Sequence, residues 1–473
     1  IEGQITVAEA QFSLGDLVQF DSETGDLLTG PNFVIDCLNP PMASILEFRG
    51  ANIVSNHALT QLFGPDANIT LRDQNTGLSA LLNFANNHNF FSVNGGYFLD
   101  INGNFTNHSN AILTANYGNT GTYPQVPAGY RIAGNLVNDG RIDLYSNSSF
   151  VVSGGVSGSG TIRVLGLPCN LQVLADVEFD LGEFNMGGSG IDGFILKAQN
   201  ASFSNGATVK GSGTIEANVS VNGGVMAPGN SPGKIAVKGN LTITGGSELQ
   251  MEIGGTAHDQ ILHSGDNASV TLGGTLSLTT IADFDDEVLS TSTYVILESS
   301  QPLTGAFPNV PNGTRVNTVD GKGSFRVNYG PGSASPAKVV ISDYIAVNAP
   351  QTYAEWIATQ ALQPAQEGIG EDPNKDGIKN LEAYFRGVAA KGPTKRRPIT
   401  TRVENGSLIA TIYSARTVTG VQFGSSTASD LTTWAAGPAP LLVGTTPTRN
   451  IYEVSVPITS TPGFIQFQID LEN

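Results

Sequence analysis

The chain of 473 residues has few charged side chains, and most of them are acidic. Asp, Glu, Lys and Arg make up 14% of the residues, and 41 acidic against 23 basic residues give a net charge of −18. This balance disfavours binding to nucleic acid and to anionic membranes. Hydrophobic residues amount to 40%, which is too many for a disordered acidic chain. We therefore expect a folded protein that has no nucleic-acid partner.

Cysteine and long apolar runs are also scarce. The only cysteines are Cys37 and Cys169, and neither lies in a C-x-x-C or Cys/His cluster, so structural zinc is not expected. The two thiols can form one disulfide or remain unpaired in the core. No run of 18 apolar residues occurs, which argues against membrane insertion.

The beginning of the chain resembles that of a processed protein. It starts at Ile1, without methionine and without a basic and apolar leader. This favours a mature product from which a secretion signal has been removed. We therefore expect the protein to be extracellular or located on a bacterial cell surface.

Short β segments bounded by Gly, Asn, Asp and Ser fill the chain from 46 to 345, and helical periodicity is almost absent there. Imperfect repeats occur as well. "INGNFTNHSNAIL" at 101–113 recurs as "IAGNLVNDGRIDL" at 132–144, and "GSGTIRV" at 158–164 recurs as "GSGTIEA" at 211–217. Repeated strands without crossover helices predict a right-handed parallel β-solenoid, with 1–45 as an N-terminal strand or cap.

In such a solenoid each coil buries its inward side chains only by stacking on its neighbours. Coils of ~20–25 residues would give roughly 13 rungs and a rod of ~60 Å. Asn and Gly are expected in the turns, where left-handed backbone angles are needed. The aromatic residues Phe90, Phe91, Tyr97 and Phe98 are expected in the core or in a lateral cover.

The C-terminal part has a different pattern. "TYAEWIATQAL" (352–362) predicts a short amphipathic helix, and "NLEAYFRGVAA" predicts a second one that ends near 392–393. These helices and the loop between them form a predicted helical linker, 346–392. The last run, "GFIQFQIDLEN", alternates apolar and polar residues as a half-buried strand does, so 393–473 is predicted to be a small β-sandwich.

Residues 223–278, which contain "APGNSPG" (227–233) and "DQIL" (259–262), resemble the autotransporter-associated β-strand repeat proteins. The helix–loop–helix and "SSTASDLTTWAAG" (425–437) resemble a C-terminal module that many such proteins carry, so the resemblance covers about 200–473. It implies a secreted or surface-exposed bacterial β-solenoid with a structural or adhesive role. No outer-membrane barrel or hydrophobic sorting tail follows, so non-covalent assembly is the expected means of retention at the cell.

The loop "EDPNKDGIKNLEAY" (371–384) is similar to a calcium-binding EF-hand loop. Oxygen ligands at alternate positions converge on a hard cation if the chain turns sharply, which Gly377 permits. Position 12, normally an acid, is Ala383, with an acid one residue earlier. The predicted structural calcium ligands are Asp372, Asn374, Asp376, the Ile378 carbonyl, Asn380 and Glu382. An ion-free turn stays open as the alternative; a bound calcium is expected to act as a clip that stiffens a junction.

Catalytic patterns are weak. "GNSPG" (229–233) matches a nucleophile elbow, but the residue after the serine is Pro232, which has no N–H for an oxyanion hole. His258 and His263 are five apart, which on a strand places them on opposite faces, so we interpret them as surface histidines. "DFDDE" (283–287) is interpreted as a solvated loop. No catalytic residue or enzymatic activity is predicted.

The leading hypothesis is a structural subunit of an extracellular filament or surface coat that assembles head to tail through its terminal strands. The basic cluster "KRRP" (395–398) is an exposed linker or a docking point on the acidic surface of the next subunit. A monomeric adhesin that binds surface glycans is the alternative. A polysaccharide lyase is a more distant one, because it rests on shared fold alone.

Overall fold

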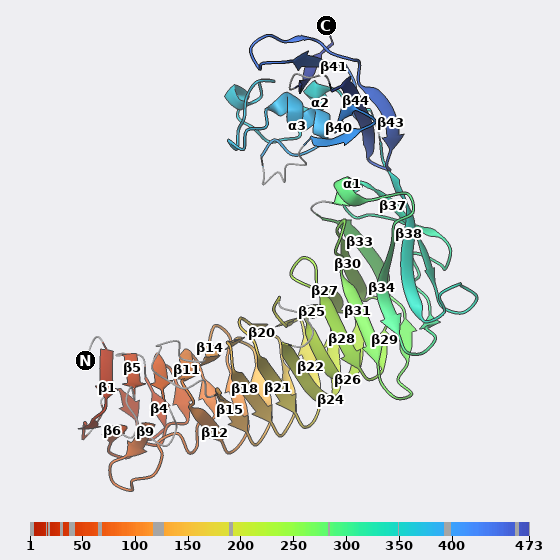
Figure 1. The fold of residues 1–473 in the computed structure, drawn as a ribbon. Coiled ribbons are helices and arrows are strands. Elements are labelled where there is room, and N and C mark those ends of the chain that lie inside the picture. Colours follow the sequence, from red (N-terminus) through yellow and green to blue (C-terminus); the bar gives the residue numbers. More distant parts are fainter. Residues whose placement is uncertain are drawn as a thin grey trace.

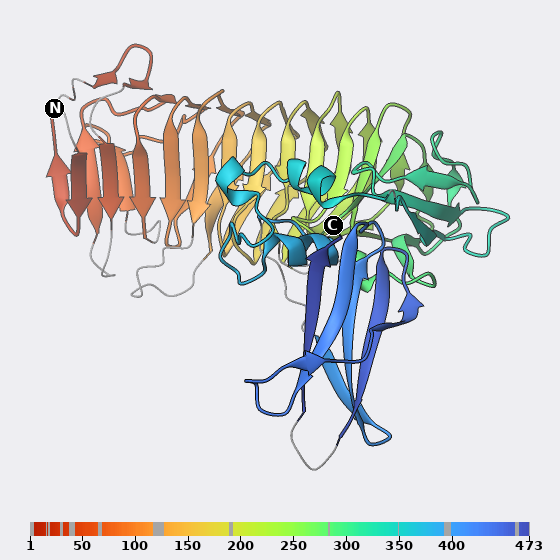
Figure 2. The same ribbon diagram turned by 90° about the horizontal axis from the view of Figure 1, so that it is seen from above.

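The computed structural model describes residues 4–15, 17, 19–28, 32–36, 43–64, 69–116, 127–188, 193–281, 284–348, 350–391, 399–458 and 463–472. The structure is mainly β, with 53% strand and 4% helix, and it contains long parallel sheets. The parallel strands stack in a row from the N-terminus, and a unit of helices and antiparallel strands follows at the far end (Figures 1 and 2). The mainly β fold is therefore as predicted.

A parallel sheet of twelve strands runs along the whole row (Figure 2). Its first strands fall within 1–45, the segment expected as a cap. In spatial order the strands are β1 (Gln4–Ala8), β5 (Asn32–Asp36), β8 (Thr60–Phe63), β11 (Phe90–Asn94), β14 (Ile112–Asn116), β17 (Arg141–Leu144), β20 (Thr161–Val164), β23 (Glu183–Asn185), β25 (Thr208–Gly211), β27 (Val225–Pro228), β30 (Glu248–Ile253) and β33 (Thr275–Thr280).

Two further columns of parallel strands accompany this sheet, and β24 (Phe194–Ser204) and β26 (Gly213–Asn222) belong to both. The first column also contains β12 (Phe98–Ile101), β15 (Ala128–Ile132), β18 (Ser148–Val152), β21 (Cys169–Val173), β28 (Lys234–Lys238), β31 (Gln260–Ser264) and β34 (Thr293–Ser299). The second contains β4 (Asp26–Leu27), β7 (Ser55–Asn56), β10 (Asn86–Asn87), β13 (Phe105–Asn107), β16 (Leu136–Asn138), β19 (Val156–Gly158), β22 (Val177–Asp180), β29 (Leu241–Ile243), β32 (Val270–Leu272) and β35 (Thr304–Gly305).

Small sheets complete the N-terminal end. β2 (Gln11–Ser13), β6 (Ser44–Phe48) and β9 (Ile69–Asp73) form a three-stranded parallel sheet, and β3 (Phe20–Asp21) pairs antiparallel with β4.

In-register pairing stacks apolar side chains into one continuous column. Ile162 pairs with Phe184, and Phe184 pairs with Val209, so residues from three successive strands meet inside. Each is at most 1% exposed. Burial of one such side chain contributes about 1.5–3 kcal/mol, so the stacked strands stabilise each other along the row. The column runs through Leu113, Ile142, Ile162, Phe184, Val209, Met226, Leu249 and Leu276.

Asparagine has a second role besides the expected turns. Asn110 and Asn147 do adopt left-handed angles, with φ of 68° and 57°. Asn56, Asn87, Asn107 and Asn138 of the second column are instead fully buried, and the side-chain amide of each of the first three donates to the Oδ1 of the next. These bonds join Asn56 to Asn87 (3.0 Å), Asn87 to Asn107 (2.9 Å) and Asn107 to Asn138 (2.8 Å).

The two predicted repeats differ in outcome. The first is confirmed, because Ile101 pairs with Ile132 and Phe105 with Leu136. The second is wrong as a structural repeat: 161–164 form β20 of the twelve-stranded sheet, whereas 213–217 belong to β26 of the other columns. A short Gly-Ser-Gly-Thr-Ile motif fits any strand that follows a tight turn, so it does not fix the sheet.

The three parallel columns end at β33, β34 and β35, within the segment expected to be solenoid. The antiparallel strands β36 (Arg315–Asn317), β37 (Gly323–Tyr329) and β38 (Lys338–Ala346) extend β34. Asn309 pairs with both backbone groups of Leu276, and Asp320 Oδ2 accepts from Thr280 N, so the outer edge of β33 is covered. The "DFDDE" prediction of a solvated loop is wrong, because its described part is α1 (Phe284–Glu287) and Phe284 is buried against Tyr344.

The C-terminal unit contains α2 (Tyr353–Ala358), the 3₁₀ helix η2 (Pro364–Gln366) and α3 (Asn380–Arg386). Thr352 caps α2 in a capping box with Glu355. Both predicted helices are therefore present, but α3 ends before 392 because Gly387 adopts a left-handed φ of 66°. Trp356 and Tyr384 pack in one cluster with Val421 of the following strands, so the helices and strands share a core.

Two antiparallel sheets complete this unit. The first has the order β39 (Thr400–Glu404), β40 (Ser407–Ala415), β44 (Arg449–Pro457) and β43 (Leu441–Thr445). The second has β42 (Ala435–Ala436), β41 (Val421–Ala428) and β45 (Phe464–Leu471). Asn348 Nδ2 donates to Pro447 O (2.9 Å) and Thr448 Oγ1 to Asp285 O (2.5 Å), which joins this unit to the segment after β38 and to α1.

The remaining sequence expectations can be placed as follows. Phe91 lies in the core, Tyr97 is also buried, and Arg131 covers the ring of the half-buried Phe98 at 4.2 Å. Cys169 is a buried free thiol, whereas Cys37 and the cluster 395–398 lie outside the described residues. Within the described ranges, none of the helices is both long and apolar enough to cross a bilayer.

Candidate functional site

The predicted calcium loop folds as a tight turn in front of α3. Gly377 adopts a φ of 86° and donates its N–H to Asp372 Oδ2 over 2.8 Å. Asp376 Oδ1 accepts from Ile378 N (2.9 Å), and Asn374 Nδ2 donates to Asp376 Oδ2 (3.2 Å). The turn thus brings three predicted ligands together, namely Asp372, Asn374 and Asp376.

One atom of this turn fits a cation. Asp372 Oδ1 is buried and has no hydrogen-bond partner among the described residues. A buried carboxylate oxygen without a donor is costly, and a hard cation such as Ca²⁺ offsets that cost. The donor set consists of carboxylate, amide and carbonyl oxygens, which is the chemistry that calcium prefers. No group of three or more His, Cys, Asp or Glu side chains that could hold a metal occurs in the described ranges, so the amide and carbonyl oxygens would be essential.

The remaining predicted ligands make other contacts. The Asn380 amide is fully buried and donates to Gln366 O (2.7 Å) and Gly368 O (2.9 Å), while its Oδ1 has no described partner. Glu382 Oε1 lies 3.5 Å from Arg386 Nη1. Ile378 buries its side chain in the core of the unit. The loop therefore ties α3 to the segment 366–371 within the C-terminal unit. The hydrogen bonds between this unit and the preceding strands come instead from Asn348 and Thr448.

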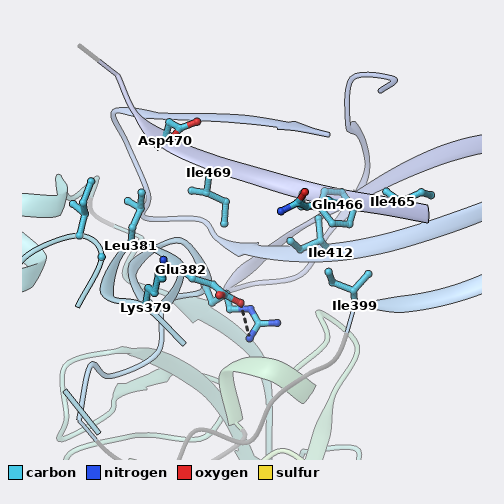
Figure 3. A pocket seen from close by; sticks show the side chains of 13 residues that line it. Lys379, Leu381, Glu382, Ile399, Ile412, Ile465, Gln466, Ile469 and Asp470 are labelled. Carbon is cyan, nitrogen blue, oxygen red and sulfur yellow. Dashed lines mark ion pairs between the residues drawn. The ribbon is translucent and has the colours of Figure 1, made fainter. Parts of the chain in front are cut away.

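A groove lies beside this loop, between α3 and β45 (Figure 3). It encloses about 560 Å³. Its lining includes the apolar side chains of Ile412, Ile465 and Ile469 (Figure 3). The ion-paired residues Glu382 and Arg386 belong to the lining as well. In the described part of the chain β45 pairs only with β41, and its side chains line this groove. An edge strand with an apolar groove beside it suits an extended peptide strand.

The nucleophile-elbow pattern proves to be a turn between two strands. "GNSPG" connects β27 to β28, so a strand follows where the elbow requires a helix. Asp259 holds the turn, because its Oδ1 accepts from Gly233 N (2.8 Å) and its Oδ2 from Glu252 N (2.7 Å). Burial raises the pKa of Asp259 to about 6.

The histidine prediction is partly wrong. His263 is buried, not on the surface, because β31 lies between β28 and β34. Its Nδ1 bonds Ser299 Oγ (2.9 Å) and its Nε2 bonds Gly239 O (2.8 Å). His258 is half-buried and bonds Val295 O (3.1 Å). Neither pair of contacts resembles a metal site.

Sequence reasoning missed a cluster of three histidines. His57, His88 and His108 stack on one another at successive levels of the parallel strands. The signal was present in the sequence as the recurring tripeptides "SNH" (55–57), "NNH" (86–88) and "TNH" (106–108).

Comparison with known proteins adds no relative. No protein-family model, no curated protein and no solved structure matches this chain. The resemblance to autotransporter-associated β-strand repeat proteins therefore stays a prediction from the quoted motifs. Function has to be inferred from the fold and from the sites described above.

Proposed function

We propose that the protein is a structural subunit of an extracellular bacterial filament or surface coat. In this proposal the stacked parallel strands form a right-handed β-solenoid, and the two antiparallel sheets form a C-terminal β-sandwich. Copies join head to tail when the first strand of one subunit pairs with the last strand of the next.

The observation that carries this proposal is that the first and the last strand each have one edge without a partner strand among the described residues. Among the described residues, β1 pairs only with β5 and β45 pairs only with β41, so each terminal strand keeps one edge for another strand. The outer edge of β33 is instead covered by Asn309 and Asp320. Simple end-on stacking of solenoids is thereby disfavoured, and β45 becomes the acceptor for β1.

Charge supports the same pairing. β1 contains no charged residue, and in a chain of net charge −18 an uncharged edge is where two copies approach at least electrostatic cost. The groove beside β45 offers Ile465 and Ile469 to the incoming apolar side chains.

Calcium has a supporting role in this proposal. Asp372, Asn374, Asp376 and the Ile378 carbonyl would hold it, and it would supply positive charge to the acidic turn. Because α3 begins directly after this turn and forms one wall of the groove, an ordered turn fixes the position of that wall.

A charge on the acceptor edge tests the proposal. Ile465→Lys places an ammonium group in the apolar lining of the groove beside β45 and should shift the protein to monomers in sedimentation velocity. Val443→Lys is the matched control, because β43 is another edge strand of the same unit and Val443 is 48% exposed. Assembly that survives Ile465→Lys but not Val443→Lys would refute pairing at β45. A wild-type monomer that binds glycans would favour the adhesin alternative.

A further inference from the structure

Three histidines form a stacked column near the N-terminal end of the parallel strands. Each follows one of the buried asparagines, so the pairing of β7, β10 and β13 places them at successive levels. The ring centroids of His57 and His88 are 4.2 Å apart with an interplanar angle of 6°. Those of His88 and His108 are 3.8 Å apart at 12°. His88 is exposed, so protons reach the column from solvent.

Acidic groups flank the column only at its ends. His57 Nε2 lies 4.0 Å from Asp26 Oδ1. His108 bonds the neutral side chain of Asn86 (3.2 Å), and the next residue in the same register is Asp139, whose Oδ1 accepts from Ser159 N. The central His88 is therefore held between two imidazoles. Partial desolvation by the packed rings, together with the charges of His108 and His57, lowers the pKa of His88 below the ordinary value of 6.5.

Neutral imidazoles stack favourably, but two imidazolium ions at this spacing repel each other. The strands that carry the rings are also joined by the Asn56–Asn87 and Asn87–Asn107 bonds. Repulsion between the rings acts directly along these bonds, because it pushes the same strands apart.

We propose that this histidine column is an acid-sensitive switch. Protonation of the three rings loosens the contacts between β7, β10 and β13, and thereby the first levels of the parallel sheets. The more distant levels carry no such column, because the two other histidines of the chain, His258 and His263, make separate contacts with backbone and serine. The switch does not depend on the proposed assembly.

The direction of the pH effect follows from His88. The unfolded chain binds its proton more readily than the folded one, so the contribution of His88 to stability is complete above about pH 6.5 and falls as the pH drops through that value.

The first test follows the protein's five histidines by NMR with ¹³C-labelled imidazoles. His88 should titrate below its ordinary pKa of 6.5, and its titration curve should show coupling to the neighbouring rings. A His88 that titrates at or above 6.5, or whose curve shows no coupling to its neighbours, would overturn the proposal. This test uses the wild-type protein and needs no variant to fold.

The second test measures hydrogen exchange by mass spectrometry. Corrected for intrinsic rates, amides of β7, β10 and β13 should exchange about tenfold faster at pH 5 than at pH 7.5. His88→Phe keeps an aromatic ring in the stack without a titrating group and should remove most of this acceleration. His258→Asn, the control, should leave it intact. Equal acceleration in the wild type and His88→Phe would contradict the switch.

Discussion

Asn107 joins two levels of the parallel strands through one buried side chain. It accepts a hydrogen bond from the Asn87 amide at 2.9 Å and donates its own amide to Asn138 Oδ1 at 2.8 Å. All three side chains are fully buried. Each asparagine side chain therefore takes the place of water as the hydrogen-bond partner of the next asparagine. The loss of one side chain leaves the asparagines on both sides with an unsatisfied polar atom.

Removal of Asn107 should destabilise the parallel strands. Asn107→Ala leaves the Asn138 oxygen without its donor and removes one acceptor from Asn87, which should cost about 2–4 kcal/mol of unfolding free energy. Urea denaturation measures this change in the unfolding free energy. Asn83→Ala is the control, because the Asn83–Asn52 bond lies at the surface and should contribute less than about 0.5 kcal/mol. A similar small effect for Asn107 would show that the ladder adds no stability.

The apolar column predicts a large effect for its central aromatic residue. Phe184 is fully buried against Phe179 and Phe203, so Phe184→Ala should lower the unfolding free energy by about 3–5 kcal/mol. Leu181 is 69% exposed, and Leu181→Ala should change it by less than about 0.5 kcal/mol. Equal effects of the two substitutions in urea denaturation would contradict the stacked core.

The calcium site predicts a charge-dependent binding event. Asp372→Asn can still accept the Gly377 N–H but loses its charge, so calcium binding measured by calorimetry should weaken at least about tenfold. Thermal unfolding of the wild type should shift upward with calcium. Glu404→Gln, on an exposed strand of the same unit, should bind like the wild type. No heat of binding for the wild type would remove calcium from the account.

Asp259 predicts a pH-dependent contribution with the opposite sign to that of His88. Burial raises its folded pKa from 3.8 to about 6, so its protonated form favours the folded state. The protonated carboxyl group contributes its full stabilisation below about pH 3.8, and this stabilisation is lost as the pH rises through about 6. A shift of this size corresponds to about 3 kcal/mol of unfolding free energy. The stability difference between the wild type and Asp259→Asn, measured from pH 4 to pH 7, should follow this curve. A difference that does not change with pH would show that the carboxyl group titrates normally.

The β fold could be predicted from the sequence because strand alternation is a local signal. The stretch "GTIRVL", which contains Ile162, shows this alternation directly. The start of α2 is also a local signal, because Thr352 and Glu355 form its capping box. The start of the twelve-stranded sheet could not be predicted as well, because its first strands, β1 and β5, are short strands between loops. α3 ends at Gly387 because this residue adopts a left-handed backbone angle. The alanines that follow favour a helix, so the sequence predicted a longer one.

The features that the sequence did not reveal are contacts between side chains of successive parallel strands. Asn87 looks like a turn residue in isolation, and only its alignment with Asn56 and Asn107 shows that it is a buried ladder position. His263 looked exposed because strand alternation gives the face of a residue but not the neighbours of the strand. At the calcium loop, the sequence placed Asp372, Asn374 and Asp376 correctly in one turn, but the contacts of Asn380 and Glu382 depend on η2 and α3.

Electron microscopy of the purified wild-type protein at high concentration with calcium tests the central claim most directly. The account predicts open filaments of rods in which the N-terminal end of each subunit contacts the C-terminal unit of the next. Single rods that remain monomeric at every concentration, or closed dimers joined at their N-terminal ends, would contradict it.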